Sequence, residues 1–457
     1  MPSSYKSESQ AASCESTSTT ALRLADHVVR ARSLPLSGAT RHAALKCLLD
    51  VLGSAGAAQD LPGVIAAHEG ALRLLGGGEA PVWFTGTRGS LSAALIANSA
   101  ATAALDLDDG YRRARGHPGA AVIPAALAVL GIRPDVTADQ VITAIVVGYE
   151  VALRVAMGRP SYAPSGAWSA YGVIATVGHL QGASAEHIAN ALAIAAQASP
   201  ALPALAGIAG SDVKEGIPYG CLAGLAALEM AAAGVTGPIG IFDDLALFNA
   251  EVILDGLGGA PLIEGTYFKP FGCCRHIHGA LDAFLALRQQ HHFEAEDIVE
   301  LEVHTYRATF NLANRPEPVS LVDAQYSVPF CLAAGAFGGA AALLPLKESQ
   351  LSDPRLLQLA HRVTVRHDPE IEPLFPARAP SRVTVTLQGA RRLDSPLVDP
   401  RGDPIRPLEW ADLVAKFQTA TAHTLGSRQQ SVLSALGRFA QGDAAALEQA
   451  LSLRWTD

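Results

Sequence analysis

The sequence is poor in cysteine, and its cysteines form no metal-binding or disulfide pattern. Six cysteines occur in 457 residues, and no two of them make a C-x-x-C pair. Small secreted domains and zinc modules depend on many regularly spaced cysteines. The sequence therefore argues against both classes and favours a reducing compartment.

Targeting and membrane signals are also missing. Residues 1–20 are rich in serine and threonine, carry acidic residues, and lack the apolar core of a secretory signal. Pro200 and Pro203 interrupt the apolar run Ile188–Gly210, which favours buried helices joined by a turn over a membrane span. We expect a disordered tail over residues 1–20 and a cytoplasmic protein.

Motifs for nucleotides and metals are absent as well. No G-x-G-x-x-G turn follows a strand, and no Walker sequence, H-E-x-x-H motif or hydrolase elbow occurs. The formal net charge of −9 argues against a nucleic-acid groove and leaves no polybasic membrane patch. We expect no cofactor, no metal, and neither nucleic acid nor membrane as a partner.

Alanine- and leucine-rich segments of helical length fill the chain to about Gly240, separated by glycine and proline. Convincing strand alternation is missing there, so we predict an all-helical domain over residues 21–265. Its predicted helices are Leu22–Ser33, Thr40–Gln59, Pro62–Leu75, Ser90–Leu107, Pro124–Leu130, Thr137–Met157, Ala167–Gln181, Ala185–Gln197 and Gly216–Gly234.

The second half of the chain adds strands. Three segments show the period-two alternation of half-buried strands: Ile298–Tyr306, Arg362–Asp368 and Ser381–Gly389. We predict an antiparallel sheet in a small α+β lid domain over residues 266–402. Residues 403–457 return to helical periodicity, clearest in Glu409–Ala422 and Gln429–Ala440, and should pack back on the first domain. The expected fold class is mainly α with a smaller α+β domain.

Charged residues gather between two apolar runs in Leu105–Gly119, LDLDDGYRRARGHPG. Asp106, Asp108 and Asp109 stand at a predicted helix end, and three arginines and His117 follow. Taken one at a time, each of these charged residues is equally well explained as an exposed, solvated side chain. As a cluster they suit acid–base chemistry, because carboxylates orient a histidine or raise its basicity. His117 also stands at the entry to the next helix, where backbone N–H groups favour an anion.

A second polar segment is SDVKEGIPYG, Ser211–Gly220, between two apolar helices. Most lysines are exposed, and a solvated linker lysine is the default interpretation of Lys214. An enclosed ammonium near a helix N-terminus would instead bind a carboxylate or stabilise negative charge that develops on one.

A third segment, FKPFGCCRHIHGALDA, places Lys269, Arg275, His276 and His278 within ten residues. Together they predict a cationic half-site. The adjacent cysteines are interpreted as packing residues. Metal ligation by the two histidines is a minor alternative, because no carboxylate stands at motif spacing.

A fourth candidate is Tyr326 in DAQYSVPF, which precedes an apolar helix. Core packing is the default interpretation of a lone tyrosine. The four segments together nevertheless resemble the MmgE/PrpD family. The resemblance is co-linear, also includes GYEVALRVA and AQYSVPFCLAAGAFGG, and extends from about Ala21 to Ala440.

The resemblance implies a helical domain built from both chain ends, a smaller α+β domain, and a cleft between them. It implies cofactor-free chemistry on a small polycarboxylate, usually in a homodimer. The catalytic residues that it implies are Asp106, His117, Lys214, His278 and Tyr326. The substrate-binding residues that it implies are Lys269, Arg275 and His276, to which we add Arg115 of the first charged segment.

Two segments depart from the family pattern. Many relatives have D-D-T-H where this chain has Asp108-Asp109-Gly110-Tyr111, and F-H-x-T where it has Trp168-Ser169-Ala170-Tyr171. Two imidazoles of the dehydratase-like pattern are therefore missing. We expect Tyr111 or Tyr171 to replace one of them as a substrate-binding group.

The resemblance leaves several reactions open. The leading hypothesis is a lyase that removes a proton next to a carboxylate, with dehydration of a 2-methylcitrate-like acid as the prototype. His117 or His278 would act as base or acid, Asp106 would orient a histidine, and the cations would stabilise charge. The alternatives are an epimerase of an amino-dicarboxylate such as iminodisuccinate, and a cis-aconitate-type decarboxylase. A non-enzymatic carboxylate-binding protein would need the cations but no acid–base residues.

Overall fold

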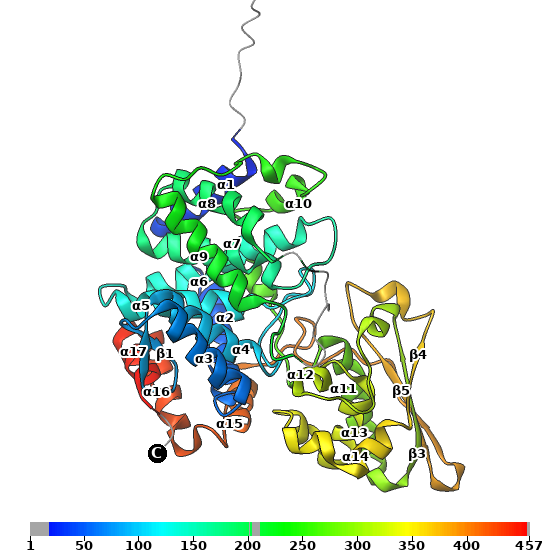
Figure 1. Cartoon of the computed structure of the whole chain (residues 1–457). Coiled ribbons are helices and arrows are strands. Elements are labelled where there is room, and N and C mark those ends of the chain that lie inside the picture. Colours follow the sequence, from blue (N-terminus) through cyan, green and yellow to red (C-terminus); the bar gives the residue numbers. More distant parts are fainter. Residues whose placement is uncertain (1–17, 201, 203–210, 455–457) are drawn as a thin grey trace, which may run out of the picture.

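The structure is a computed structural model, and it describes residues 18–200, 202 and 211–454. Figure 1 shows a large helical unit and, beside it, a smaller unit that carries the longer strands. Most of the predicted N-terminal tail lies outside the described residues, and so does Pro203 of the predicted turn.

Both ends of the chain build the helical unit. The C-terminal helix α15 packs on α2, where Lys416 Nζ donates a hydrogen bond to Asp50 Oδ1 over 2.6 Å. The helices of this unit are α1 (Thr20–Arg30), α2 (Gly38–Ala57), α3 (Pro62–Leu75), α4 (Leu91–Ala103), α5 (Gly119–Ile132), α6 (Ala138–Met157), α7 (Gly166–Gln181), α8 (Ala185–Ala198), α9 (Ile217–Ala232), α10 (Ala250–Leu254), α15 (Trp410–Ala420), α16 (Gln429–Ala440) and α17 (Ala444–Ser452).

The helical unit departs from its sequence prediction in two places. It contains an antiparallel pair, β1 (Ala80–Val82) with β2 (Thr87–Gly89), so it is not all-helical. Strands of three residues are too short to show alternation. Helix α5 begins at Gly119, and Pro124 lies inside it rather than at its start. The Asp109 carboxylate explains this early start, because Oδ1 accepts a hydrogen bond from the Gly119 N–H over 3.1 Å.

Helix α6 lies in the core of the unit. By length and composition it is the one described helix that could cross a membrane, but 78% of its apolar window is buried inside the protein. A capping box of Thr137 and Gln140 fixes its first turn. Its apolar faces are covered by other helices, including α5 and α7.

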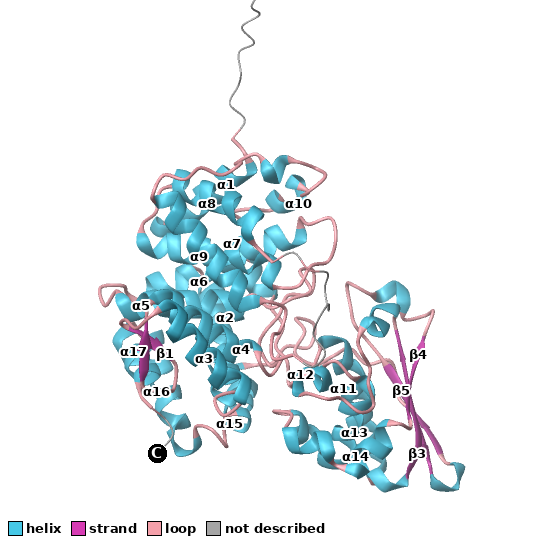
Figure 2. Cartoon of the chain, in the orientation of Figure 1, coloured by secondary structure: helices cyan, strands magenta, loops and turns pink. Residues whose placement is uncertain are grey.

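The smaller unit is a mixed sheet covered by helices. The strand order is β4-β3-β5-β6, and α11 and α13 pack against the sheet (Figure 2). Buried Leu301, Val303 and Thr305 alternate along β3. The elements are α11 (Arg275–His291), β3 (Ile298–Thr305), α12 (Leu321–Gln325), α13 (Val328–Gly338), α14 (Pro354–Ala360), β4 (Val363–His367), β5 (Arg382–Leu387) and β6 (Arg392–Asp394).

The predicted antiparallel sheet is only partly correct. Strands β3 and β5 pair antiparallel, and so do β5 and β6, but β3 and β4 run parallel. The reason lies in the connection, because α12, α13 and α14 intervene between β3 and β4. Such a long helical crossover brings the next strand back in the same direction.

Gly402 fixes the loop that carries Lys269. Its φ is +96°, and a Cβ on it would lie 1.9 Å from the Phe268 carbonyl oxygen. The Phe268 N–H also donates a hydrogen bond to the Gly402 carbonyl. We expect Gly402→Ala to lower the free energy of unfolding by about 3 kcal/mol, measured by urea denaturation.

A matched control for this substitution is Gly256→Ala. Gly256 has a φ of +65°, and nothing lies within 4 Å of its missing Cβ. That variant should lose only the backbone strain of a left-handed alanine, about 1 kcal/mol. Equal losses in the two variants would mean that the contact with Phe268 does not matter.

Candidate active site

A cavity of about 100 Å³ lies between the two units. The helical unit provides carboxylates, an imidazole, two guanidinium groups and a tyrosine ring, and the smaller unit provides aromatic rings, a guanidinium and an imidazole. Its lining residues include Asp106, Arg112, Arg115, His117, Tyr162, Glu215, Tyr267, Cys274, Arg275, His276, Asn311, Tyr326 and Phe375.

Asp106 is the centre of a buried ion-pair cluster. It follows the end of α4 with a φ of 50°, and its side chain is 1% exposed. Lys214 Nζ and Lys269 Nζ both donate to its Oδ1, the second over 2.8 Å. Burial alone would raise the pKa of Asp106, but the two ammonium groups and His117 outweigh burial and hold it well below its usual range. Asp106 is therefore ionised, and its Oδ2 has no hydrogen-bond partner among the described residues.

The two predicted lysines thus stand behind Asp106. Lys214 is also 3.3 Å from Asp108 Oδ1. Burial lowers the pKa of Lys214, but Asp106 and Asp108 raise it above its usual value. Neither lysine is among the residues that line the cavity. They reach the cavity only indirectly, because both donate to Asp106, which does line it.

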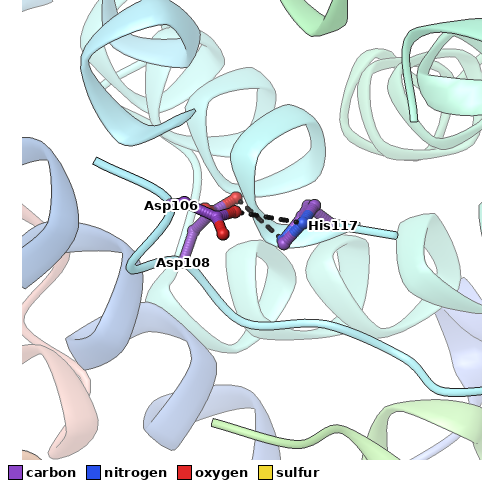
Figure 3. Close-up of side chains that lie close together, drawn as sticks. All are labelled: Asp106, Asp108 and His117. Carbon is purple, nitrogen blue, oxygen red and sulfur yellow. Dashed lines mark ion pairs between the residues drawn. The ribbon is translucent and has the colours of Figure 1, made fainter. Parts of the chain in front are cut away.

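Asp106, Asp108 and His117 converge closely enough to suggest a metal site (Figure 3). One ligand atom from each lies within 4.8 Å of the others. The surrounding charges do not fit a divalent cation, because two ammonium groups already donate to Asp106 and one of them reaches Asp108. The donor set fits a neutralised ion-pair cluster.

His117 directs one ring nitrogen to the backbone and the other to the cluster. Its Nδ1 lies 2.8 Å from the Asp109 carbonyl oxygen, which can only accept, so the proton resides on Nδ1. Its Nε2 lies 3.5 Å from Asp106 Oδ1 and 4.0 Å from Glu215 Oε1. Burial, Lys214 and Lys269 lower the pKa of His117, and Asp108 and Glu215 only partly offset them. A neutral imidazole near pH 7 follows.

Asp109 also takes part in this arrangement, through hydrogen bonds to its carboxyl group. Its Oδ2 accepts a 2.5 Å hydrogen bond from the Tyr149 hydroxyl, and its Oδ1 accepts from the Gly119 N–H. Burial, and then the charge of Asp50, raise the pKa of Asp109 to about 7. The start of α5, where the sequence predicted an anion, is therefore capped by this carboxyl group.

Glu215 lies in the cavity wall, and sequence analysis missed it. Its φ is 55°, and its carboxylate is 4% exposed. Ser165 donates to Oε2 through its N–H over 2.8 Å and its hydroxyl over 2.5 Å. The sequence clue to Glu215 is K-E-G, in which an acid directly follows Lys214. The glycine after it has a φ of +67° and turns the chain into α9.

The cavity also carries excess positive charge, from Arg112 and Arg115 of the helical unit and Arg275 of the smaller unit. Arg275 and Arg112 both donate to the single carboxylate of Asp403, Arg275 over 2.6 Å. Arg275 also stacks on the Tyr267 ring at 4.8 Å, and its buried Nε has no hydrogen-bond partner among the described residues. Arg115 adds a third guanidinium, 5.5 Å from the Tyr162 ring. Three cations against one carboxylate suit an anionic ligand.

The two predicted histidines of α11 have different positions. His276 lines the cavity, and its Nδ1 lies 2.7 Å from the Tyr306 hydroxyl. Burial, Arg112 and Arg115 lower the pKa of His276 to about 4. His278 is fully buried behind Arg275, between the Cys273 carbonyl and the guanidinium. Both of its nitrogens are engaged, so the pair does not fit metal ligation.

Tyr326 lines the cavity from the smaller unit. Its hydroxyl donates to Glu215 Oε1 over 3.4 Å. Burial, Glu215 and Asp106 raise the pKa of Tyr326 well above its usual value. Tyr326 is therefore a protonated donor that faces the carboxylates of the helical unit.

The structure does not bring Tyr111 or Tyr171 to the cavity. Tyr171 is fully buried in the helical core, with its ring 5.7 Å from that of Phe242. Tyr111 is half-buried beside Gly265. Tyr162 and Tyr267 line the cavity instead. Both lie outside the family motifs, so the motifs gave no signal for them.

Gly110 explains the presence of Tyr267. A Cβ on Gly110 would lie 2.3 Å from the Tyr267 hydroxyl oxygen, and the two backbones pair through hydrogen bonds of 3.0 and 2.9 Å. The departure from the D-D-T-H pattern therefore makes room for an aromatic ring under Arg275.

Comparison with known proteins identifies the family. A profile of the MmgE/PrpD N-terminal domain matches residues 22–255, and one of the MmgE/PrpD C-terminal domain matches residues 271–438. No curated protein matches the chain significantly. The two profiles cover most of the chain and span both walls of the cavity. The chain therefore belongs to the MmgE/PrpD family, and this membership supports a dehydratase- or lyase-like enzyme.

Proposed function

We propose that the protein is a cofactor-independent hydro-lyase that acts on a small di- or tricarboxylate, by proton abstraction next to a carboxylate. The observation that carries the proposal is that His117 and three guanidinium groups line one cavity. The prototype substrate is a 2-methylcitrate-like acid.

His117 is the base in this proposal. Its Nδ1 proton is held by the Asp109 carbonyl, so the lone pair of Nε2 is directed toward the cluster and the cavity. Its lowered pKa keeps the imidazole neutral near pH 7, which is the form that accepts a proton. General base catalysis of this kind contributes about 10²- to 10⁴-fold to rate.

The three guanidinium groups would stabilise the charge that proton abstraction creates. An enolate-like carboxylate carries more negative charge than the ground state, and Arg275, Arg112 and Arg115 exceed their single acidic partner. One preorganised donor contributes about 3 to 4 kcal/mol to a transition state of this kind. Arg275 also stacks on the Tyr267 ring at 4.8 Å, and both residues line the cavity.

Tyr326 would assist departure of the hydroxyl group. It is a protonated donor that lines the cavity from the smaller unit, whereas His117 belongs to the helical unit. Water then leaves with the proton of Tyr326.

A second candidate is epimerisation of an amino-dicarboxylate such as iminodisuccinate. Two observations favour it: the cavity of about 100 Å³ is small, and the base and the acid that line it come from different units. A four-carbon substrate fits such a volume more readily than a branched tricarboxylate. Decarboxylation of a cis-aconitate-like acid is a third reaction of the same site. The proposal includes a homodimer, which is what the family resemblance implies.

Proton NMR in deuterated buffer tests the proposal with 2-methylcitrate, citrate, cis-aconitate and iminodisuccinate. We expect an alkene product from a hydroxy acid. Deuterium wash-in with only a change of stereochemistry would establish the epimerase, and carbon dioxide release the decarboxylase. Binding without exchange or turnover of any acid would leave a carboxylate-binding protein and overturn the enzyme proposal.

A further inference from the structure

Glu215 has a position that the proposed reaction does not yet use. Its Oε1 lies 3.4 Å from the Tyr326 hydroxyl and 4.0 Å from His117 Nε2. Tyr326 comes from the smaller unit and His117 from the helical unit, so one carboxylate oxygen stands between the two acid–base groups of the cavity. Asp106 and Asp108 already neutralise Lys214, so Glu215 is not needed for that purpose.

Glu215 is also held in place on all sides. Both donors of Ser165 bind Oε2, which leaves Oε1 for the cavity. The Ser165 hydroxyl oxygen in turn accepts from the His117 N–H over 3.0 Å. The Glu215 carbonyl accepts from the Gly166 N–H at the start of α7. A non-glycine residue at φ of 55° costs about 1 to 3 kcal/mol, and such strain gathers at functional sites.

We infer that Glu215 is a proton relay that resets the site by returning a proton from His117 to Tyr326. The inference rests on the proposed function. In the forward step His117 Nε2 takes the proton from carbon, the C–H electron pair forms the double bond, and the C–O bond breaks. The leaving hydroxide takes the Tyr326 proton and departs as water. The site is left with an imidazolium and a phenolate.

The relay restores the starting state without any co-reactant. Glu215 Oε1 accepts the imidazolium Nε2 proton and passes it to the phenolate oxygen, so no proton is gained or lost by the protein. Epimerisation leaves the same two groups mismatched, because His117 takes a proton from one face and Tyr326 gives one to the other. The relay therefore serves both candidate reactions.

Rapid-quench kinetics of Glu215→Gln test the relay, with the acid of the panel that the wild type converts fastest. Gln keeps the shape of Glu but cannot carry the proton. We expect the first turnover to stay within about threefold of wild type, followed by steady-state turnover about 10²-fold slower. The expected signature is a burst of about one product per site.

A burst would not arise if Glu215 only orients Tyr326 or tunes His117. In that case the first turnover and kcat would fall together, and this outcome overturns the relay. Glu215→Asp is the second variant, and it should recover much of kcat because a carboxylate is restored. Glu150→Gln is the matched control, since Glu150 is a buried carboxylate bound to Arg154 outside the cavity lining. It should show no burst.

The two proposals fail differently. A wild type that converts no acid of the panel overturns the proposed function and the relay with it. A wild type that turns over, with a Glu215→Gln variant that shows no burst, overturns the relay alone.

Discussion

Lys214→Met should produce a protein that is less stable by about 3 to 5 kcal/mol and at least 10²-fold less active. Its Nζ donates to Asp106 and Asp108, and all three side chains are 1% exposed or less. Removing one partner of a buried ion pair leaves the other charge without compensation. Lys269 would remain as the one ammonium group donating to Asp106 among the described residues.

The same substitution should change the pH dependence of the reaction. Burial is the largest cause of the lowered pKa of His117, and Lys214 is the next. Without Lys214 that pKa rises, so kcat/KM should begin to fall at a higher pH on the acid side. Urea denaturation measures the loss of stability, and a pH profile of kcat/KM measures the shift.

Lys416→Met is the matched control. Lys416 is 6% exposed and pairs with Asp50 over 2.6 Å, but neither residue lines the cavity. This variant should lose a similar amount of stability and keep its kcat per folded molecule and its pH profile. If both variants lose activity equally, the loss reflects instability and Lys214 has no special role at the site.

The helices were predictable because their signals are local. Apolar periodicity, caps and glycine breaks act within a few residues, and α16 has the predicted bounds Gln429–Ala440. The parallel pairing of β4 depends on a crossover of three helices, and the early start of α5 depends on Asp109. These tertiary causes have no counterpart in local periodicity.

The residues of the candidate site also divide into those that the sequence could predict and those that depend on tertiary contacts. Asp106, His117 and Tyr326 belong to dense polar or family motifs, and the structure gathers them at one cavity. Tyr267 and Asp403 carry no motif, because their roles come from Arg275, which stacks on one and binds the other. Tyr171 was a motif position whose side chain the packing of α7 directs into the core. Motif position alone does not say which face of a helix a residue occupies.

His117→Asn should lower kcat by about 10² to 10⁴-fold and remove the acid limb of the pH profile. Asn can still donate to the Asp109 carbonyl, as His117 Nδ1 does over 2.8 Å, but it cannot take a proton at the position of Nε2. In the wild type, protonation inactivates the base as pH falls. Burial and the two lysines lower the pKa of His117. The pH at which half of the activity is lost should therefore lie below 6.5, the ordinary pKa of a histidine.

The pH profile must be separated from unfolding. A histidine whose pKa is lowered in the folded state binds more protons when unfolded, so folded stability also falls as pH decreases below about 6.5. Rates are therefore compared only where circular dichroism shows folded protein. His276→Gln is the control, because His276 also lines the cavity and burial lowers its pKa to about 4. If His276→Gln removes the acid limb and His117→Asn keeps it, His276 is the base and the assignment of His117 is wrong.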